Sequence, residues 1–369
     1  DQDQFDVRID QRFSDRDRLF GRYSYAKDTT DPVTPLPEGG GNITAGAIGR
    51  TRTTAQSFVV NHVHSLSALL LNELRFGYTR RSVDRTSQLL DAPPSQSLGL
   101  PGIPSNAAFD NAMLTILIGG LQQLGPPLNT NSDFSTDVTQ IYDAASLQHG
   151  RHSIKAGVDF RLERLNVIQP PAPTGQFTFN TVLTSSQGIA AIGTPLASFT
   201  GNSLASFLLG QVQTFSIDLQ TKEFRPRASI LEFFVQDDWK ATSRLTINAG
   251  LRYTLNFPSS ELDDQGAVFN LSTQKLDYLG RDGFPETARE LHKLNFGPRL
   301  GFAYRLTERT VIRSGYGVIW QEQAGITTPF TTPQFPFLQT VTQRSLDNRN
   351  PAFVLSTGPS VVALPLTPD

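Results

Sequence analysis

Two histidines separated by one residue are the first side chains here whose type and spacing could bind a metal. In an extended strand His62 and His64 point to the same side, because successive side chains alternate between faces. Two imidazoles need further ligands to hold an ion such as Zn²⁺, and the sequence places no third ligand beside them. Histidines near the end of a strand are more often interfacial. We therefore expect no metal site and no cofactor.

Two other short motifs suggest catalysis, but neither fits the strand pattern around it. Asp237 and Asp238 are adjacent, so in a strand their carboxylates face opposite sides and cannot act on one substrate. Gly315-Tyr316-Gly317 resembles a nucleotide loop, yet it lies inside a predicted strand with no helix after it. No Ser/His/Asp or two-carboxylate arrangement stands out. We expect a protein that is not an enzyme.

Arginines form the larger group of candidate functional residues. Six of them fall near the middle of predicted strands, always on the polar side: Arg8, Arg75, Arg161, Arg252, Arg299 and Arg313. Acidic residues alternate with them, so one role is ion pairing along a polar wall and hydrogen bonding to whatever fills the space beside it. The other role is a polar track for an anionic or peptide-like ligand. The sequence leaves both open.

Strands with one apolar side must position these arginines, and the segment 294–320 shows the pattern best. Between 294 and 304 apolar residues alternate with polar or small ones, which predicts a strand. A short polar break at 306–309 joins it to a second alternating arm, as in a β-hairpin. Four earlier hairpins follow from the same pattern, with arms at 5–13 and 19–25, 53–64 and 69–80, 137–147 and 153–164, and 229–239 and 244–256.

One predicted arm, 53–64, does not alternate cleanly. Phe58 and Val60 indicate one apolar face, whereas Val59 and Val63 indicate the other. The sequence alone does not decide which side of this strand is apolar.

The length of the arms and the position of their aromatics predict a membrane protein. The arms run for about ten residues, against roughly 5–6 for an ordinary strand, and aromatics gather near strand ends. Both are typical of an antiparallel transmembrane β-barrel, whose apolar side contacts lipid and whose polar side lines a lumen. A soluble β-sandwich or β-helix is the alternative, and it needs a second layer over the apolar side. The aromatic girdle is expected to contain Tyr23, Tyr25, Tyr78, Trp239, Tyr253, Tyr304 and Trp320.

The connections alternate between about four residues and roughly twenty to sixty. In an antiparallel meander this places all long loops on one side, as in outer-membrane barrels with short periplasmic turns and long extracellular loops. Within the loops we expect a short strand in 113–118 and a short helix at 202–210, with Asn202 or Ser203 as N-cap and Gly210 as its end. The segment 321–369 reads as a Pro/Thr-rich loop.

Composition excludes several other classes. With 369 residues, 38% hydrophobic and 18% charged, the chain is not of a disordered type, and no run approaches the roughly eighteen apolar residues of a membrane-spanning helix. A net charge of −2 and a pI near 6.3 give no reason to expect nucleic acid as a partner. The sequence has no cysteine, which excludes disulfides and thiolate metal sites.

Three phrases carry a family resemblance: RIDQRFSDRDRLFGRYSY, FFVQDDWKATSRLTINAGLRY and NFGPRLGFAYRLTERTVIRSGYGVIW. They resemble the barrel of TonB-dependent outer-membrane receptors, and specifically the Oar-like subfamily. The resemblance covers nearly the whole chain and is strongest at 231–253 and 295–320. It implies that 1–369 is one domain, an internal part of a barrel of about 22 strands. The plug, an N-terminal regulatory-like domain and the C-terminal strands are not recognisable in it.

The resemblance also implies a function and partners. Such receptors lie in the bacterial outer membrane, bind a large extracellular ligand with their loops and import it when the TonB complex pulls on the plug. The expected partners are outer-membrane lipid, the TonB complex through the missing plug region, and an extracellular ligand that the sequence does not identify. A passive porin-like channel and a structural or adhesive surface protein are the alternatives.

Overall fold

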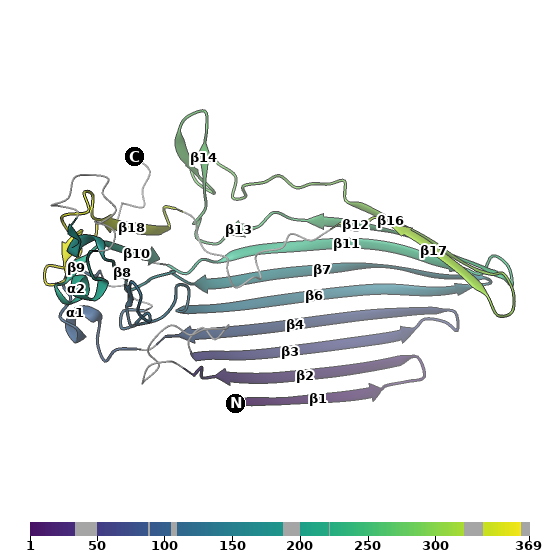
Figure 1. The fold of residues 1–369 in the computed structure, drawn as a ribbon. Helices are drawn as coiled ribbons and strands as arrows, with labels where there is room; N and C mark the ends of the chain where they lie inside the picture. Colours follow the sequence, from purple (N-terminus) through teal and green to yellow (C-terminus); the bar gives the residue numbers. More distant parts are fainter. Residues whose placement is uncertain are drawn as a thin grey trace.

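One large antiparallel sheet forms the body of the protein in a computed structural model that describes residues 1–33, 50–87, 89–104, 109–186, 200–220, 222–320 and 335–362. Its long strands pair in the order β1-β2-β3-β4-β6-β7-β11-β12-β16-β17. Within the described residues β1 and β17 are its two edges, so the barrel is not closed (Figure 1). The strands are β1 (Gln2–Arg12), β2 (Asp17–Thr30), β3 (Arg50–Ser65), β4 (Leu70–Thr86), β6 (Ser132–His149), β7 (His152–Ile168), β11 (Pro226–Trp239), β12 (Leu245–Asn256), β16 (Phe296–Arg305) and β17 (Val311–Gly317).

All five predicted hairpins are present, but several strands extend further toward the loops than the sequence pattern indicates. β6 and β7, for example, stay paired from His149 opposite His152 to Asp133 opposite Ile168. Backbone hydrogen bonds continue there while the apolar alternation fades. An extension that leaves the hydrocarbon layer needs no apolar side, so it gives no periodic signal.

The apolar side of the sheet is not covered by a second protein layer in the described part of the chain. Leu251, Leu300 and Phe302 are 42%, 59% and 43% exposed. Residues paired across strands share a face, and Leu251 lies between Val235 and Pro298. This confirms the predicted apolar face and removes the soluble sandwich as an alternative.

The register also decides the ambiguous arm of β3. Phe58 pairs with Tyr78, so both lie on the apolar side, which we call the outward face. Val59 pairs with Gly77 and with Arg22 of β2, so it lies on the polar side, called the inward face. Val59 is tolerated on the inward face because one neighbour, Gly77, is small and the other, Arg22, is long and flexible.

Short turns lie at one end of the sheet and long connections at the other (Figure 1). In the described part of the chain, the five hairpins close through turns after Arg12, Ser65, His149, Trp239 and Arg305. The strands β2, β4, β7 and β12 end at the opposite end of the sheet, which we call the loop end. This confirms the predicted asymmetry.

The long connections fold into a small domain at the loop end, called the cap. Its sheet has the order β18-β10-β8-β5, formed by β18 (Leu338–Arg344), β10 (Thr214–Gln220), β8 (Gln176–Phe179) and β5 (Thr115–Ile118). β19 (Phe353–Val354) pairs with β9 (Gln211–Val212) beside it. The core of the cap consists of Leu114, Ile118, Phe177, Phe179, Val212, Phe215 and Ile217. β5 confirms the predicted extra strand, but reading 321–369 as loop was wrong, since β18 and β19 belong to the cap.

Helices are few and short in the described residues. α2 (Ser203–Leu208) confirms the predicted helix: the Asn202 side chain accepts hydrogen bonds from the amides of Leu204 and Ala205, at 2.9 and 3.1 Å. Gly210 ends the segment at φ +69°, a conformation that favours glycine. The other helices are α1 (Pro94–Ser97) and η2 (Val182–Thr184). No helix in the described residues is long and apolar enough to cross a membrane.

A further hairpin, β14 (Ala267–Asn270) with β15 (Lys275–Tyr278), projects from the loop end between β12 and β16 (Figure 1). β13 (Ser260–Glu261) leads into it by pairing with the start of β11. Neither hairpin arm carries a long apolar alternation, which is why the sequence did not predict them.

Candidate functional site

The inward face of the sheet carries all six arginines that the sequence singled out. Arg252 pairs across strands with Gly297, and Arg299 pairs with Gly250 and Gly317, so these positions share one face. Arg8 lies opposite Arg22, and Arg75 lies between Asn61 and Tyr142. Arg161 faces Gln140 and Ile230, and Arg313 faces Ala303. Strand alternation therefore placed every one of these side chains on the polar side.

Four of the six arginines are held in ion pairs. Arg8 binds Asp10 with two hydrogen bonds of 2.7 and 2.8 Å. Arg75 donates to Glu73 at 2.6 Å and to Asn61 at 3.2 Å. Arg252 binds Glu232, and Arg161 lies 3.8 Å from the same carboxylate. These four have the structural role that ion pairing predicts.

Glu232 is the buried carboxylate that contacts both Arg252 and Arg161. Its side chain is only 5% exposed, and its other carboxylate oxygen accepts from the Thr254 hydroxyl at 2.9 Å. A buried carboxylate is stable only when its oxygens are hydrogen-bonded or ion-paired. Glu232 therefore fixes Arg252 and Arg161 against the wall.

Arg299 and Arg313 form no hydrogen bond or ion pair with the described residues. Glycines flank Arg299 on both neighbouring strands, and a Cβ on Gly317 would lie only 3.4 Å from its side chain. Arg22, opposite Arg8, likewise forms no hydrogen bond or ion pair with the described residues. Like charges placed opposite one another repel, so this wall favours an anionic group beside it.

Two aromatic rings continue the cationic face between these arginines. Tyr142 and Phe234 stack with their ring centroids 5.9 Å apart. Arg75 and Lys155 each lie 5.6 Å from the centre of the Tyr142 ring, within cation–π distance. Sequence analysis missed both aromatics, because they occupy positions on the polar side of their strands. That departure from the alternation is the signal that could have identified them.

Gly157 makes this stacking possible. It lies on β7, between the strands that carry Tyr142 and Phe234. A Cβ at this position would meet the Phe234 ring at 2.8 Å and the Asp143 carbonyl at 2.4 Å. The absent side chain lets Phe234 lie across β7 and reach Tyr142.

Two grooves follow the inward face. One, of about 390 Å³, is lined by Arg8, Arg22 and Arg75 together with Phe20 and Gln140. The other, of about 260 Å³, is lined by Lys155, Arg252 and Arg299 together with Tyr142 and Phe234. Both present cations beside aromatic rings, a surface that suits an anionic ligand with flat or apolar parts.

The outward face has polar groups near the turns, and they are paired. Asp143 accepts from the Asn72 side chain at 2.7 Å. Asp237 lies 2.6 Å from Nδ1 of His152, whose ring stacks on Trp239 at 5.5 Å. Asp237 thus pairs outward while Asp238 binds Asn248 on the inward face, as expected of adjacent strand residues.

Six of the seven predicted girdle residues lie in the long strands, and the register places these six on the outward face. Trp239 and Tyr304 lie at the turn end, whereas Tyr253 lies toward the loop end and stacks on Phe296 at 4.6 Å. Tyr23 lies closer to the middle of its strand, beside Phe5 and Phe58, than a girdle position requires. The remaining predicted girdle residues are Tyr25, Tyr78 and Trp320.

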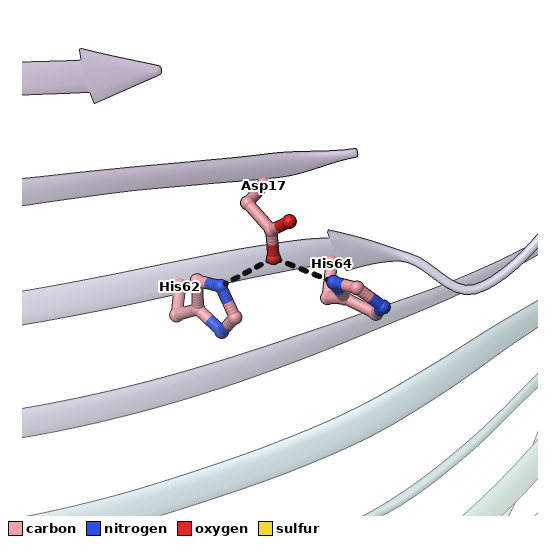
Figure 2. Close-up of side chains that lie close together, drawn as sticks. All are labelled: Asp17, His62 and His64. Carbon is pink, nitrogen blue, oxygen red and sulfur yellow. Dashed lines mark hydrogen bonds and ion pairs between the residues drawn. The ribbon is translucent and has the colours of Figure 1, made fainter. Parts of the chain in front are cut away.

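The two histidines of the HxH motif are joined by a residue that the sequence did not place. Figure 2 shows Asp17, His62 and His64 converging, and the register places all three on the outward face. One carboxylate oxygen of Asp17 lies 3.2 Å from Nε2 of His62 and 2.6 Å from Nδ1 of His64. Asp17 opens β2 directly opposite His64 of β3. Only the register of these two strands brings together groups more than forty residues apart in the chain.

The cap carries its own buried charge. Asp218 accepts from the backbone amide of Ala172 at 3.0 Å and from the Thr340 hydroxyl. Burial raises the pKa of the Asp218 carboxyl, and the two hydrogen bonds oppose this shift only in part. In the exposed loop 345–350, backbone amides of Asn350 and Arg349 lower the pKa of Asp347 to about 2. These carboxylates organise the cap rather than a reactive centre.

The chain belongs to the outer membrane beta barrel domain family, whose sequence profile matches residues 1–368. It is therefore an antiparallel β-barrel protein of the bacterial outer membrane, with its outward face in lipid. No curated protein matches the chain.

Several solved structures are similar in fold. The alcaligin outer-membrane receptor FauA from Bordetella pertussis is 11% identical, with a TM-score of 0.46 over 87% of this chain and 36% of that one. The ferric-catecholate import receptor Fiu from E. coli K12 is 13% identical, with a TM-score of 0.45 over 87% and 47%. The ferric preacinetobactin receptor BauA from Acinetobacter baumannii is 13% identical, with a TM-score of 0.41 over 93% and 43%. The chain spans less than half the length of these three receptors.

Proposed function

We propose that this protein is the barrel part of a TonB-dependent receptor of the Oar-like type, which imports a large anionic ligand across the outer membrane. The observation that carries the proposal is the cationic inward face, where Arg299, Arg313 and Arg22 have no counter-ion among the described residues. Arg8 and Arg252 on the same wall are paired with carboxylates, so these three arginines are cations left available to an anionic ligand.

The sequence resemblance supports the receptor class. Its three phrases fall on β1 and β2, on β11 and β12, and on β16 and β17, which are hairpins of the barrel wall. In this class a plug fills the lumen and the TonB complex pulls on it. The unpaired arginines then face the space that plug and ligand share.

The proposed mechanism uses the chain's own residues in two steps. The cap, on the extracellular side, makes the first contact with the ligand. The cationic inward face then attracts the ligand's anionic groups once the plug moves, while Tyr142 and Phe234 offer aromatic surface to its flat parts. Exposed charges interact weakly in water, so the track guides the ligand without trapping it.

A surface-binding protein without transport is the second candidate, and the cap favours it. The cap has its own hydrophobic core, so the loops present a fixed surface to a partner outside the cell. Both candidates predict ligand binding, but only a receptor needs energy from the inner membrane.

Uptake by whole cells tests the proposal even though the ligand is unidentified. Cells with and without the complete protein are grown in one rich medium, and mass spectrometry compares the spent media. We expect anionic compounds to be depleted only when the protein is present and the proton-motive force is intact. Arg299→Gln together with Arg313→Gln should slow this depletion several-fold, whereas Arg309→Gln in an exposed turn should not.

Each other outcome has a definite meaning. Depletion that persists after addition of an uncoupler identifies a passive channel. Binding of cells to a surface without depletion of any compound identifies an adhesin. Unchanged depletion by the double arginine variant contradicts the cationic track while leaving the receptor class intact.

A further inference from the structure

We propose that Asp17, His62 and His64 bind a divalent transition-metal ion such as Zn²⁺ or Cu²⁺ at the turn end of the outward face (Figure 2). The site is separate from the inward face and does not depend on the proposed transport function. Two imidazoles and one carboxylate are a common ligand set for such ions, and three protein ligands leave a position for water.

The carboxylate oxygen of Asp17 already lies close to the distance from each imidazole nitrogen that a shared metal ion requires. All three lie within 4.8 Å of one another. An ion about 2.0–2.1 Å from each ligand holds tetrahedral ligand atoms roughly 3.3 Å apart. The Asp17–His62 distance of 3.2 Å matches this value, and the Asp17–His64 distance of 2.6 Å requires only a small outward shift of one ring.

The turn before β2 orients the carboxylate. Ser14 donates its hydroxyl hydrogen to the second oxygen of Asp17 at 2.8 Å and accepts from the Asp17 amide at 3.0 Å. The carbonyl of Arg16 also accepts from the amide of Ser65, which ties the turn to the end of β3. Hydrogen bonds that hold a ligand in place typically strengthen a metal site by fixing its orientation.

Two further observations support a metal site at Asp17, His62 and His64: the exposure of these side chains, and a comparison with the His152–Asp237 pair. The three side chains are each about one-third exposed, at 31–36%, and they lie beside the turns, where the outward face leaves the hydrocarbon layer and an ion can reach them. His152 and Asp237 form a comparable pair on the same face, but that carboxylate contacts a single imidazole. In the described part of the chain, Asp17, His62 and His64 are the residues whose donor atoms meet the spacing of a metal site.

Metal titration of the purified complete protein in detergent, made without a polyhistidine tag, tests the proposal. Cu²⁺ is added and followed by electron paramagnetic resonance, which reports the nitrogens bound to copper. We expect one Cu²⁺ ion to bind tightly per protein molecule, with a spectrum that shows two nitrogen ligands. His62→Asn and His64→Asn should each weaken it by roughly tenfold or more and leave a single nitrogen, and His152→Asn should leave affinity and spectrum unchanged.

Three results would overturn the proposal. They are the absence of a tight equivalent in the wild-type protein, a two-nitrogen signal that survives both His62→Asn and His64→Asn, and loss of the signal in His152→Asn. If a variant fails to fold, the nitrogen count of the wild-type protein and Zn²⁺ competition against the bound Cu²⁺ still decide the question.

Discussion

At the scale of single residues, a buried carboxylate joins two arginines of the inward wall. Glu232 holds Arg252 and Arg161 and accepts from Thr254, and it is almost completely buried. By contrast, the Arg8–Asp10 pair on the same wall is exposed, at 54% and 61%. The two ion pairs therefore differ in the solvent around their carboxylates.

We expect Glu232→Gln to lower the free energy of unfolding of the complete protein by about 2 kcal/mol, because it removes the buried negative charge that Arg252 and Arg161 share. Asp10→Asn should change it by less than about 1 kcal/mol, since exposed pairs are screened by water. Urea unfolding in lipid vesicles, followed by tryptophan fluorescence, measures both. Equal effects of the two substitutions would contradict the assigned burial.

Strand alternation in the sequence predicts the face on which the candidate arginines lie. It does not predict which of them are ion-paired and which are unpaired. Alternation alone shows which side Arg252 and Arg299 face. It does not show that Glu232 of a neighbouring strand reaches Arg252, or that glycines isolate Arg299. Likewise, Asp17 could not be assigned to His62 and His64 without the register of β2 against β3.

At the scale of secondary-structure elements, β12 shows how strictly the two faces are separated. Leu251 lies outward between Val235 and Pro298, and Asn248 lies inward beside Asp238. The same new charge should therefore have very different effects at these two positions.

We expect Leu251→Arg to reduce the free energy of folding into vesicles by about 2–4 kcal/mol, the cost of a charge on the lipid side near mid-membrane. Asn248→Arg serves as the matched control, because its guanidinium can pair with Asp238 in the aqueous lumen. Folding yields in vesicles across a urea series give both values. A penalty of the same size at both positions would contradict the outward assignment of Leu251.

The long strands could be predicted from the sequence because lipid on one side and water on the other impose a period of two. The cap could not. Its strands are short and partly buried on both sides, and they pair with partners far away, as β10 does with β18. Such pairing leaves no periodic pattern, which is why the segment 321–369 looked like a loop.

At the scale of the whole molecule, the two ends of the sheet face different compartments. The turn 306–310 lies at one end of the sheet and the β14–β15 hairpin projects at the other (Figure 1), and we expect the first to face the periplasm and the second the cell exterior. This arrangement can be checked directly in cells.

An epitope inserted after Ser272, between β14 and β15, should be detected by antibody on intact cells. The same epitope inserted after Thr307, between β16 and β17, should be detected only after the outer membrane is permeabilised. Both insertions fall in exposed turns, where insertions are usually tolerated. Detection at Thr307 on intact cells would reverse the assigned orientation.

The pairing of β10 with β18 also sets an order of events during biogenesis. Asp218 and Thr340, which bond across these strands, are 122 residues apart, and β11, β12, β16 and β17 lie between them in the chain. A contact that closes so long a stretch of chain carries a large entropic cost and forms slowly. We therefore expect the β10–β18 part of the cap to form only after the hairpins between these strands have been synthesised and translocated.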